Sequence, residues 1–200
     1  MNKEIEAKFV SVNHDDLREK LTQLGAECEQ PMRLMRRVVY HGNNDKDAYF
    51  RVRDEGYRIT MTYKEFHDAS SIHGVSEIET TVGDFDQAVA LLDQTELHRE
   101  TYQETKRENW RLGDVELMLD EWPWVDPFVE IEGPSEVAVR DVAERLGFDW
   151  NDAVYGGVAT VYLKKYTGMG DHEAAAIIIN RKTPVIKFEM PVPEVFKVGQ

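Results

Sequence analysis

The chain begins with an alternation of ionisable residues that could hold a metal ion beside an anion. Glu4, Glu6 and Lys8 are separated by single apolar residues. Side chains two positions apart in a β-strand point to the same face, so two carboxylates and one ammonium group would share a surface. Carboxylates bind divalent cations and ammonium groups bind anions. Taken alone, the pattern is also typical of a half-exposed strand whose polar face meets water.

The same spacing of carboxylates recurs twice further along the chain. The later pairs are Glu77 with Glu79 and Glu130 with Glu132. Two carboxylates on one face repel each other unless a cation lies between them or water screens them. Polar faces of other predicted strands carry basic residues, which are Arg51, Arg53, Lys64 and Arg107. If the sheet closes, the acids could hold a divalent metal ion and the bases could bind polyanion oxygens.

Hydrophobic periodicity and turn residues predict the elements that would position these groups. We expect strands at residues 3–10, 32–40, 47–53, 57–64, 74–82, 99–112, 114–121 and 126–132. We expect helices at 13–24, 84–94, 135–147 and 152–165. The strands are mostly joined by hairpin signals such as Asp54-Glu55-Gly56. This pattern favours an α+β fold with an antiparallel sheet or barrel over a parallel α/β sheet.

Composition excludes several classes of function. The formal net charge of −14 would repel phosphates over most of the surface, which argues against a nucleic-acid partner. The only cysteine, Cys28, excludes an intramolecular disulfide, and we expect a small packed residue near a helix end rather than a reactive thiol. The six histidines are scattered, so a zinc site is not expected.

The location of the protein follows from two further features. No apolar run approaches the roughly 20 residues that span a bilayer, so no membrane partner is expected. The N-terminus is charged within four residues and shows no signal peptide. We therefore expect a cytoplasmic protein, and a homodimer is left open.

In the order and spacing of its charged motifs, the chain resembles the CYTH superfamily, the triphosphate tunnel metalloenzymes. This superfamily includes class IV adenylyl cyclases, thiamine triphosphatases and inorganic triphosphatases. The motifs are Glu4-x-Glu6-x-Lys8, Arg51-x-Arg53, Lys64, Glu77-x-Glu79, Lys106-Arg107, Asp120 and Phe128-x-Glu130-x-Glu132. The resemblance covers residues 1–168, and residues 169–200 are expected to form a C-terminal extension.

The resemblance implies an eight-stranded antiparallel barrel, with flanking helices, that forms a tunnel. Triphosphate would be bound by Lys8, Arg51, Arg53, Lys64, Lys106 and Arg107. Mg²⁺ or Mn²⁺ would be held by Glu4, Glu6, Asp120, Glu130 and Glu132. The catalytic set would comprise Glu4, Glu6, Lys8 and Lys64. Glu77 and Glu79 would be further tunnel residues.

Two departures from the family pattern bear on the site. Relatives often carry a glycine-rich stretch before the Phe-x-Glu-x-Glu strand, whereas this chain has the bulky segment Trp122–Pro127, which could reshape the tunnel mouth. Some relatives use a C-terminal lysine. Lys164 or Lys165 could correspond to it, although surface lysines at a helix end are the preferred interpretation.

Three functions follow from the resemblance and the charges. The leading hypothesis is a metal-dependent hydrolase of a small-molecule triphosphate: tripolyphosphate, thiamine triphosphate or a nucleoside triphosphate. The alternative is a class IV-type adenylyl cyclase that converts ATP to cyclic AMP and pyrophosphate, a reaction that needs a purine pocket. The third is a non-catalytic module that binds polyphosphate or nucleotides, which would not need so many carboxylates.

Overall fold

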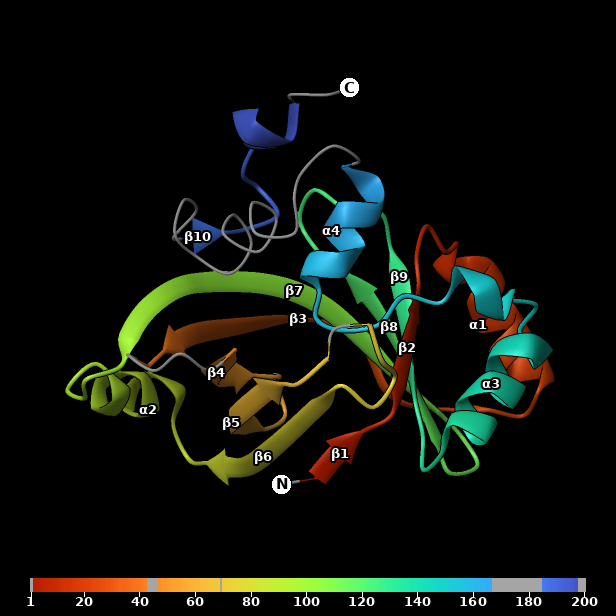
Figure 1. Cartoon of the computed structure of the whole chain (residues 1–200), viewed down its shortest axis with the longest axis horizontal. Coiled ribbons are helices and arrows are strands. Elements are labelled where there is room, and N and C mark those ends of the chain that lie inside the picture. Colours follow the sequence, from red (N-terminus) through yellow and green to blue (C-terminus); the bar gives the residue numbers. More distant parts are fainter. Residues whose placement is uncertain (1, 43–46, 69, 167–184, 198–200) are drawn as a thin grey trace.

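The computed structural model describes residues 2–42, 47–68, 70–166 and 185–197. Within them, ten strands form one curled sheet and four helices lie outside it (Figure 1). The strands are β1 (Asn2–Glu4), β2 (Glu6–Phe9), β3 (Glu27–His41), β4 (Ala48–Asp54), β5 (Ile59–Phe66), β6 (Val75–Val82), β7 (His98–Leu112), β8 (Val115–Glu121), β9 (Phe128–Glu132) and β10 (Val185–Ile186). The helices are α1 (His14–Gln23), α2 (Phe85–Leu92), α3 (Glu136–Arg145) and α4 (Ala159–Lys165), with 3₁₀ turns η1 (Trp150–Asp152) and η2 (Glu194–Lys197).

The N-terminal segment connects the two ends of the sheet. The strand order is β1-β6-β5-β4-β3-β7-β8-β9-β2, so β1 and β2 are the terminal strands although only Ile5 separates them in sequence. β1 pairs with β6, where Glu4 faces Val75, and β2 pairs with β9, where Lys8 faces Glu130. The curl of the sheet is therefore completed through the covalent chain at Ile5, and not by hydrogen bonds between β1 and β2.

The α+β class and the curled antiparallel sheet are confirmed, whereas the strand count is corrected. The predicted first strand is divided at Ile5 because its two halves pair with different strands. β10 is an additional strand that pairs in parallel with β7, at Val185 and Tyr102. The fourth helix begins at Ala159 and not at residue 152, because the backbone of Val154 pairs with that of Lys8 and Gly156 has a φ of +82°.

The main apolar core lies between the sheet and the helices α1 and α3, which lie side by side in Figure 1. Leu17 and Leu21 of α1 and Val139 and Val142 of α3 are buried there against the apolar faces of β2, β8 and β9. Asn13 caps α1 by accepting hydrogen bonds from two backbone N–H groups. The alternation that buries apolar side chains on this face turns the charged residues of the same strands to the other face.

A second core contains aromatic side chains from distant parts of the chain. Phe128, Tyr162, Tyr166 and Phe196 are buried together, and Ile186 of β10, which pairs with β7, is fully buried as well. The described part of the predicted C-terminal extension, residues 185–197, is therefore packed against the domain. Residues 169–184 and 198–200 lie outside the described residues.

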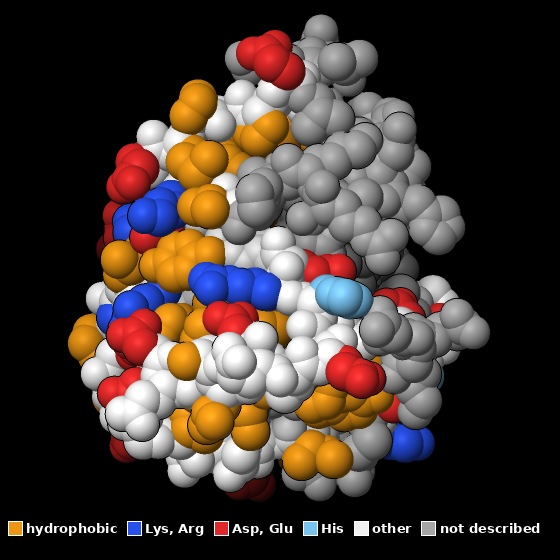
Figure 2. Space-filling model, turned by 90° about the vertical axis from the view of Figure 1, so that its left-hand side faces the viewer, with side chains coloured by type: hydrophobic (Ala, Val, Ile, Leu, Met, Phe, Trp, Pro, Cys, Tyr) orange, Lys and Arg blue, Asp and Glu red, His pale blue; other side chains and the backbone are white. Residues whose placement is uncertain are grey.

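Two properties of the surface complete the description. Cys28 is exposed within β3, so the expectation of a packed residue near a helix end was wrong: β3 begins at Glu27, earlier than predicted. On the face shown in Figure 2, apolar, acidic and basic side chains are intermixed. Among the residues described, none of the helices combines the length and apolar character needed to cross a membrane.

Candidate functional site

A cavity of about 290 Å³ lies inside the curled sheet. Each of the nine strands β1–β9 contributes at least one side chain to its lining. The acidic lining residues are Glu4, Glu6, Glu55, Glu77, Glu79, Glu116, Glu130 and Glu132. The basic lining residues are Lys8, Arg37, Arg51, Arg53, Arg58, Lys64 and Arg107. A chain of strongly negative charge thus gathers acids and bases in nearly equal number around one cavity.

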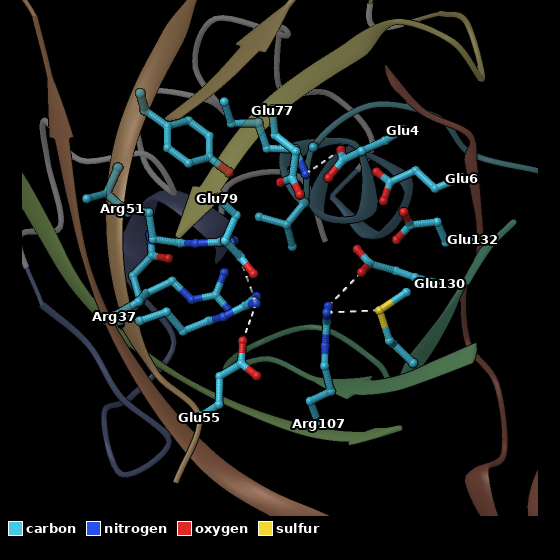
Figure 3. A pocket seen from close by; sticks show the side chains of 18 of the residues that line it. Glu4, Glu6, Arg37, Arg51, Glu55, Glu77, Glu79, Arg107, Glu130 and Glu132 are labelled. Carbon is cyan, nitrogen blue, oxygen red and sulfur yellow. Dashed lines mark hydrogen bonds and ion pairs between the residues drawn. The ribbon is translucent and has the colours of Figure 1, made fainter. Parts of the chain in front are cut away.

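Carboxylates predominate on one side of the cavity and guanidinium groups on the other, and Arg107 connects the two sides through an ion pair of 2.6 Å with Glu130. Glu4, Glu6, Glu130 and Glu132 lie together on one side of the view in Figure 3, and the guanidinium groups on the opposite side approach them across the cavity. We refer to these four glutamates as the carboxylate wall. The arginine cluster comprises Arg37 of β3, Arg51 and Arg53 of β4 and Arg107 of β7.

Strand pairing produces the carboxylate wall. Glu6 of β2 is directly opposite Glu132 of β9 in the register. Burial and the nearby charges of Glu6 and Glu4 raise the pKa of Glu132 to about 8. Like-charged groups opposite each other destabilise a sheet, so this pair is a place where a bound cation would stabilise the protein.

Two lysines lie within the carboxylate wall. The Lys8 ammonium group is 2.6 Å from a carboxylate oxygen of Glu6 and 3.4 Å from one of Glu130. It also donates a hydrogen bond of 2.7 Å to the carbonyl oxygen of Gly156. Lys64 Nζ lies 2.6 Å from a carboxylate oxygen of Glu4. Burial lowers the pKa of Lys8, but Glu6 and Glu130 outweigh it and the pKa is raised, so Lys8 is a cation in the site.

The arginine cluster concentrates positive charge on the facing strands. Arg37 is directly opposite Arg53 in the register of β3 and β4, and Arg51 lies two residues from Arg53 on the same face. Burial and neighbouring guanidinium groups lower the pKa of Arg37 well below its ordinary value, and that of Arg53 to about 10. Such a cluster is stabilised by an anion placed between its members.

The cluster is only partly neutralised by carboxylates of the protein. Arg53 forms an ion pair with Glu55, and Glu79 lies 3.6 Å from Arg51 and 3.9 Å from Arg53. Arg37 differs, because among the described residues it forms no ion pair with a carboxylate. Its Nη2 donates to Thr105 Oγ1 at 2.9 Å, and its buried Nε has no hydrogen-bond partner.

Eleven of the thirteen predicted site residues line the cavity, and the other two do not. Lys106 points to the opposite face of β7 from Arg107, where its Nζ lies 3.0 Å from Glu121, because adjacent residues of a strand face opposite sides. Asp120 is fully buried behind the cavity and accepts two hydrogen bonds from Arg107, at 2.8 and 2.7 Å. In this structure the carboxylate of Asp120 therefore holds an arginine, and its predicted role as a metal ligand stays a prediction.

The sequence interpretation missed several lining residues. Arg37, Glu55, Asn109 and Glu116 line the cavity but were not among the predicted site residues. The adjacent pair Arg36-Arg37 hides the alternation of β3, which the buried positions Met35 and Arg37 reveal only in the structure. Neither Lys164 nor Lys165 lines the cavity, in agreement with the interpretation as surface lysines.

The donors of the carboxylate wall suit a hard divalent cation. Mg²⁺ and Mn²⁺ prefer oxygen ligands, and the wall offers carboxylates whose mutual repulsion a cation would relieve. In the part of the chain that the structure describes, no three His, Cys, Asp or Glu side chains are positioned to hold a metal ion by themselves. The residues therefore fit a Mg²⁺ ion bound by one or two carboxylates together with oxygens of a ligand and water.

The family model of the CYTH domain matches residues 2–153, which include every strand from β1 to β9. The chain belongs to the CYTH domain family. No curated protein matches it.

Solved structures share the fold of this CYTH protein. The PH1012 protein from Pyrococcus horikoshii OT3 is 26% identical, with a TM-score of 0.65 over 75% of this chain and 93% of that one. The PH1819 protein from the same organism is 24% identical, with a TM-score of 0.64 over 81% and 99%. A Vibrio parahaemolyticus protein described as a "putative adenylate cyclase" is 14% identical, with a TM-score of 0.65 over 78% and 95%.

Proposed function

We propose that this CYTH protein is a metal-dependent hydrolase of triphosphates, inorganic or organic, bound in the cavity. The observation that carries the proposal is that one cavity brings the arginine cluster and the carboxylate wall to the same space, with Lys8, Lys64 and Arg107 paired to the wall. The arginine cluster suits phosphate oxygens, and the carboxylate wall suits a divalent cation bound to the same ligand. The family, which includes triphosphatases and adenylyl cyclases, supports this combination.

The residues of the cavity would neutralise and orient the substrate. Triphosphate carries about four negative charges, which must be balanced before water can attack phosphorus. Planar guanidinium groups such as that of Arg53 can each bind two phosphate oxygens, whereas Lys8 and Lys64 act as point charges that Glu6 and Glu4 hold in place. A bound Mg²⁺ ion would supply polarisation of the phosphoryl oxygens and charge neutralisation.

Hydrolysis in this site would proceed by direct attack of water. The cysteine of the chain, Cys28, is exposed on the surface and does not line the cavity. No serine or threonine side chain belongs to the lining among the described residues, so a covalent intermediate on a hydroxyl group has no support. Charge stabilisation and positioning would carry the catalysis, as is usual for phosphoryl transfer.

A substrate panel tests the proposal. Purified protein is incubated with tripolyphosphate, thiamine triphosphate or ATP, each with Mg²⁺ or Mn²⁺. Release of orthophosphate is expected. Formation of cyclic AMP and pyrophosphate from ATP would instead show a cyclase, and binding without turnover under every metal would show a binding module.

A matched pair of variants connects the activity to the carboxylate wall. Glu130→Gln removes one charge from that wall, and we expect turnover to fall at least about tenfold. Glu136→Gln is the control, because Glu136 is only partly buried at the start of α3 and does not line the cavity. Full activity of Glu130→Gln at ordinary Mg²⁺ concentrations would remove this residue from the site.

A further inference from the structure

Two described segments beyond the matched domain converge on one turn beside the cavity. The turn comprises residues 122–127 and connects β8 to β9; we call it the tryptophan turn. α4 belongs to one segment, and residues 185–197, which we call the C-terminal clasp, form the other. Trp124 of the turn has a φ of +70°, a backbone conformation that non-glycine residues rarely adopt and that its surroundings must hold.

The first set of contacts comes from α4. The hydroxyl group of Tyr162 donates a hydrogen bond of 2.6 Å to the carbonyl oxygen of Pro123. The hydroxyl group of Tyr166 donates one of 2.5 Å to the carbonyl oxygen of Trp124. Both bonds fix the backbone of the tryptophan turn rather than its side chains, so they define where the turn lies.

The C-terminal clasp adds a second set. Phe196 is 2% exposed, and its ring centroid lies 4.5 Å from that of Tyr166, 5.6 Å from that of Tyr162 and 5.9 Å from that of Trp124. The indole N–H of Trp124 donates a hydrogen bond of 3.0 Å to the carbonyl oxygen of Met190. Burying an aromatic ring among three others stabilises a specific arrangement of all four.

The tryptophan turn in turn holds a group in the cavity. Trp122 lines the cavity and is buried, and the guanidinium carbon of Arg37 lies 4.6 Å from the centroid of a ring of Trp122. The guanidinium group of Arg37 contacts Trp122 and Thr105, and no carboxylate among the described residues pairs with it. The position of Trp122 therefore contributes to where this guanidinium group points.

We propose that the C-terminal clasp is a positioning element of the site, which holds Arg37 toward the ligand through Trp124 and Trp122. Phe196 and Met190 fix Trp124, the turn places Trp122, and the ring of Trp122 orients the guanidinium group. An arginine oriented before the ligand arrives loses less conformational freedom on binding. The inference rests on the proposed function, because it assigns the clasp a role in binding triphosphate.

The test compares variants of the clasp in steady-state kinetics with tripolyphosphate. Phe196→Ala removes the ring that packs against the turn, and we expect KM to rise by about fivefold or more with a smaller change in kcat. Phe196→Leu keeps an apolar side chain and should restore most of the affinity. Trp124→Phe keeps an aromatic side chain but removes the indole N–H that donates to Met190, so it should shift KM in the same direction by less.

Two controls separate positioning from stability. Val192→Ala changes an exposed aliphatic residue of the same clasp and should leave KM unchanged. Leu146→Ala creates a cavity in the core below α3, away from the site, and should lower the melting temperature with no change in KM. If Phe196→Ala also lowered the melting temperature without changing KM, the clasp would only stabilise the fold and the inference would be overturned.

A double-variant cycle tests the route through Trp122. If the clasp acts through Trp122, the effects of Phe196→Ala and Trp122→Ala on KM are not additive, because Phe196→Ala alone already frees the ring of Trp122 from its position. Full additivity would overturn the inference while leaving the proposed function intact. A wild-type protein with no affinity for any triphosphate would refute the proposed function, and the inference with it.

Discussion

Replacing Arg37 with methionine should make the free protein more stable and the ligand complex weaker. The guanidinium group is buried, lacks a carboxylate partner among the described residues and faces Arg53 across the strand pair. Replacing a buried charged group with an apolar side chain of similar length commonly stabilises a protein by about 1–4 kcal/mol. Loss of the contact with Trp122 offsets about 0.5–2 kcal/mol of this.

At the middle of each range, the two contributions leave a net gain of about 1 kcal/mol in the free energy of unfolding. For a chain of this size, that gain raises the melting temperature by about 2–4 °C. The affinity for tripolyphosphate should change in the opposite direction. A hydrogen bond to a charged group contributes about 1.5–3 kcal/mol, so the dissociation constant should rise about 10- to 100-fold.

Urea denaturation without ligand and titration calorimetry with tripolyphosphate measure the two effects. Arg145→Met is the control, since Arg145 is partly exposed on α3 and pairs with Asp141 at 3.3 Å, and we expect changes within about 0.5 kcal/mol in both assays. An Arg37→Met protein less stable than the wild type would refute the argument that the Arg37 charge destabilises the folded protein in the absence of ligand. Unchanged affinity would refute its role in the site.

Two further predictions follow from particular ion pairs. Burial disfavours the charged form of Glu55, but Arg53 and Arg58 outweigh burial and lower the pKa of this carboxyl group to about 2. The ionised Glu55 therefore stabilises the fold at pH values above the ordinary carboxyl pKa, and this stabilisation is lost as the pH falls toward about 2. The difference in unfolding free energy between wild type and Glu55→Gln should therefore shrink between about pH 5 and pH 2; a constant difference in acid titrations of stability would contradict this assignment. Lys8→Ala should raise the KM for tripolyphosphate at least about tenfold. Lys106 lies on the opposite face of the sheet, so Lys106→Ala should leave KM unchanged. Equal effects of the two changes in steady-state assays would contradict the assignment of Lys8 to the binding face and Lys106 to the other.

Strand alternation predicted the inward faces of the sheet because side-chain direction in a strand depends only on position. Glu6, Arg53 and Glu130 were placed correctly by this rule. The rule also decides between Lys106 and Arg107, which are adjacent and cannot both point into the cavity. The prediction of Lys106 as a ligand followed a motif where the alternation alone would have excluded it.

Other features could not be predicted because they depend on residues far apart in the sequence. Asp120 shares the inward face of β8, but Arg107 covers its carboxylate, and this follows from pairing between β7 and β8. The role of Arg37 depends on Arg53 lying opposite it, which only the register of β3 and β4 sets. The packing of Phe196 against Tyr166 was also hidden, since sequence patterns do not say where a terminal segment docks.

The division of the first strand at Ile5 has a consequence for how the protein is made. During synthesis, residues 2–9 leave the ribosome well before their partners, which are β6, ending at Val82, and β9, ending at Glu132. Contacts between such distant residues slow folding, because a long stretch of chain must be ordered before they form. Residues 2–9 thus find their neighbours only long after they are translated, and the cavity is assembled only after β9 has emerged.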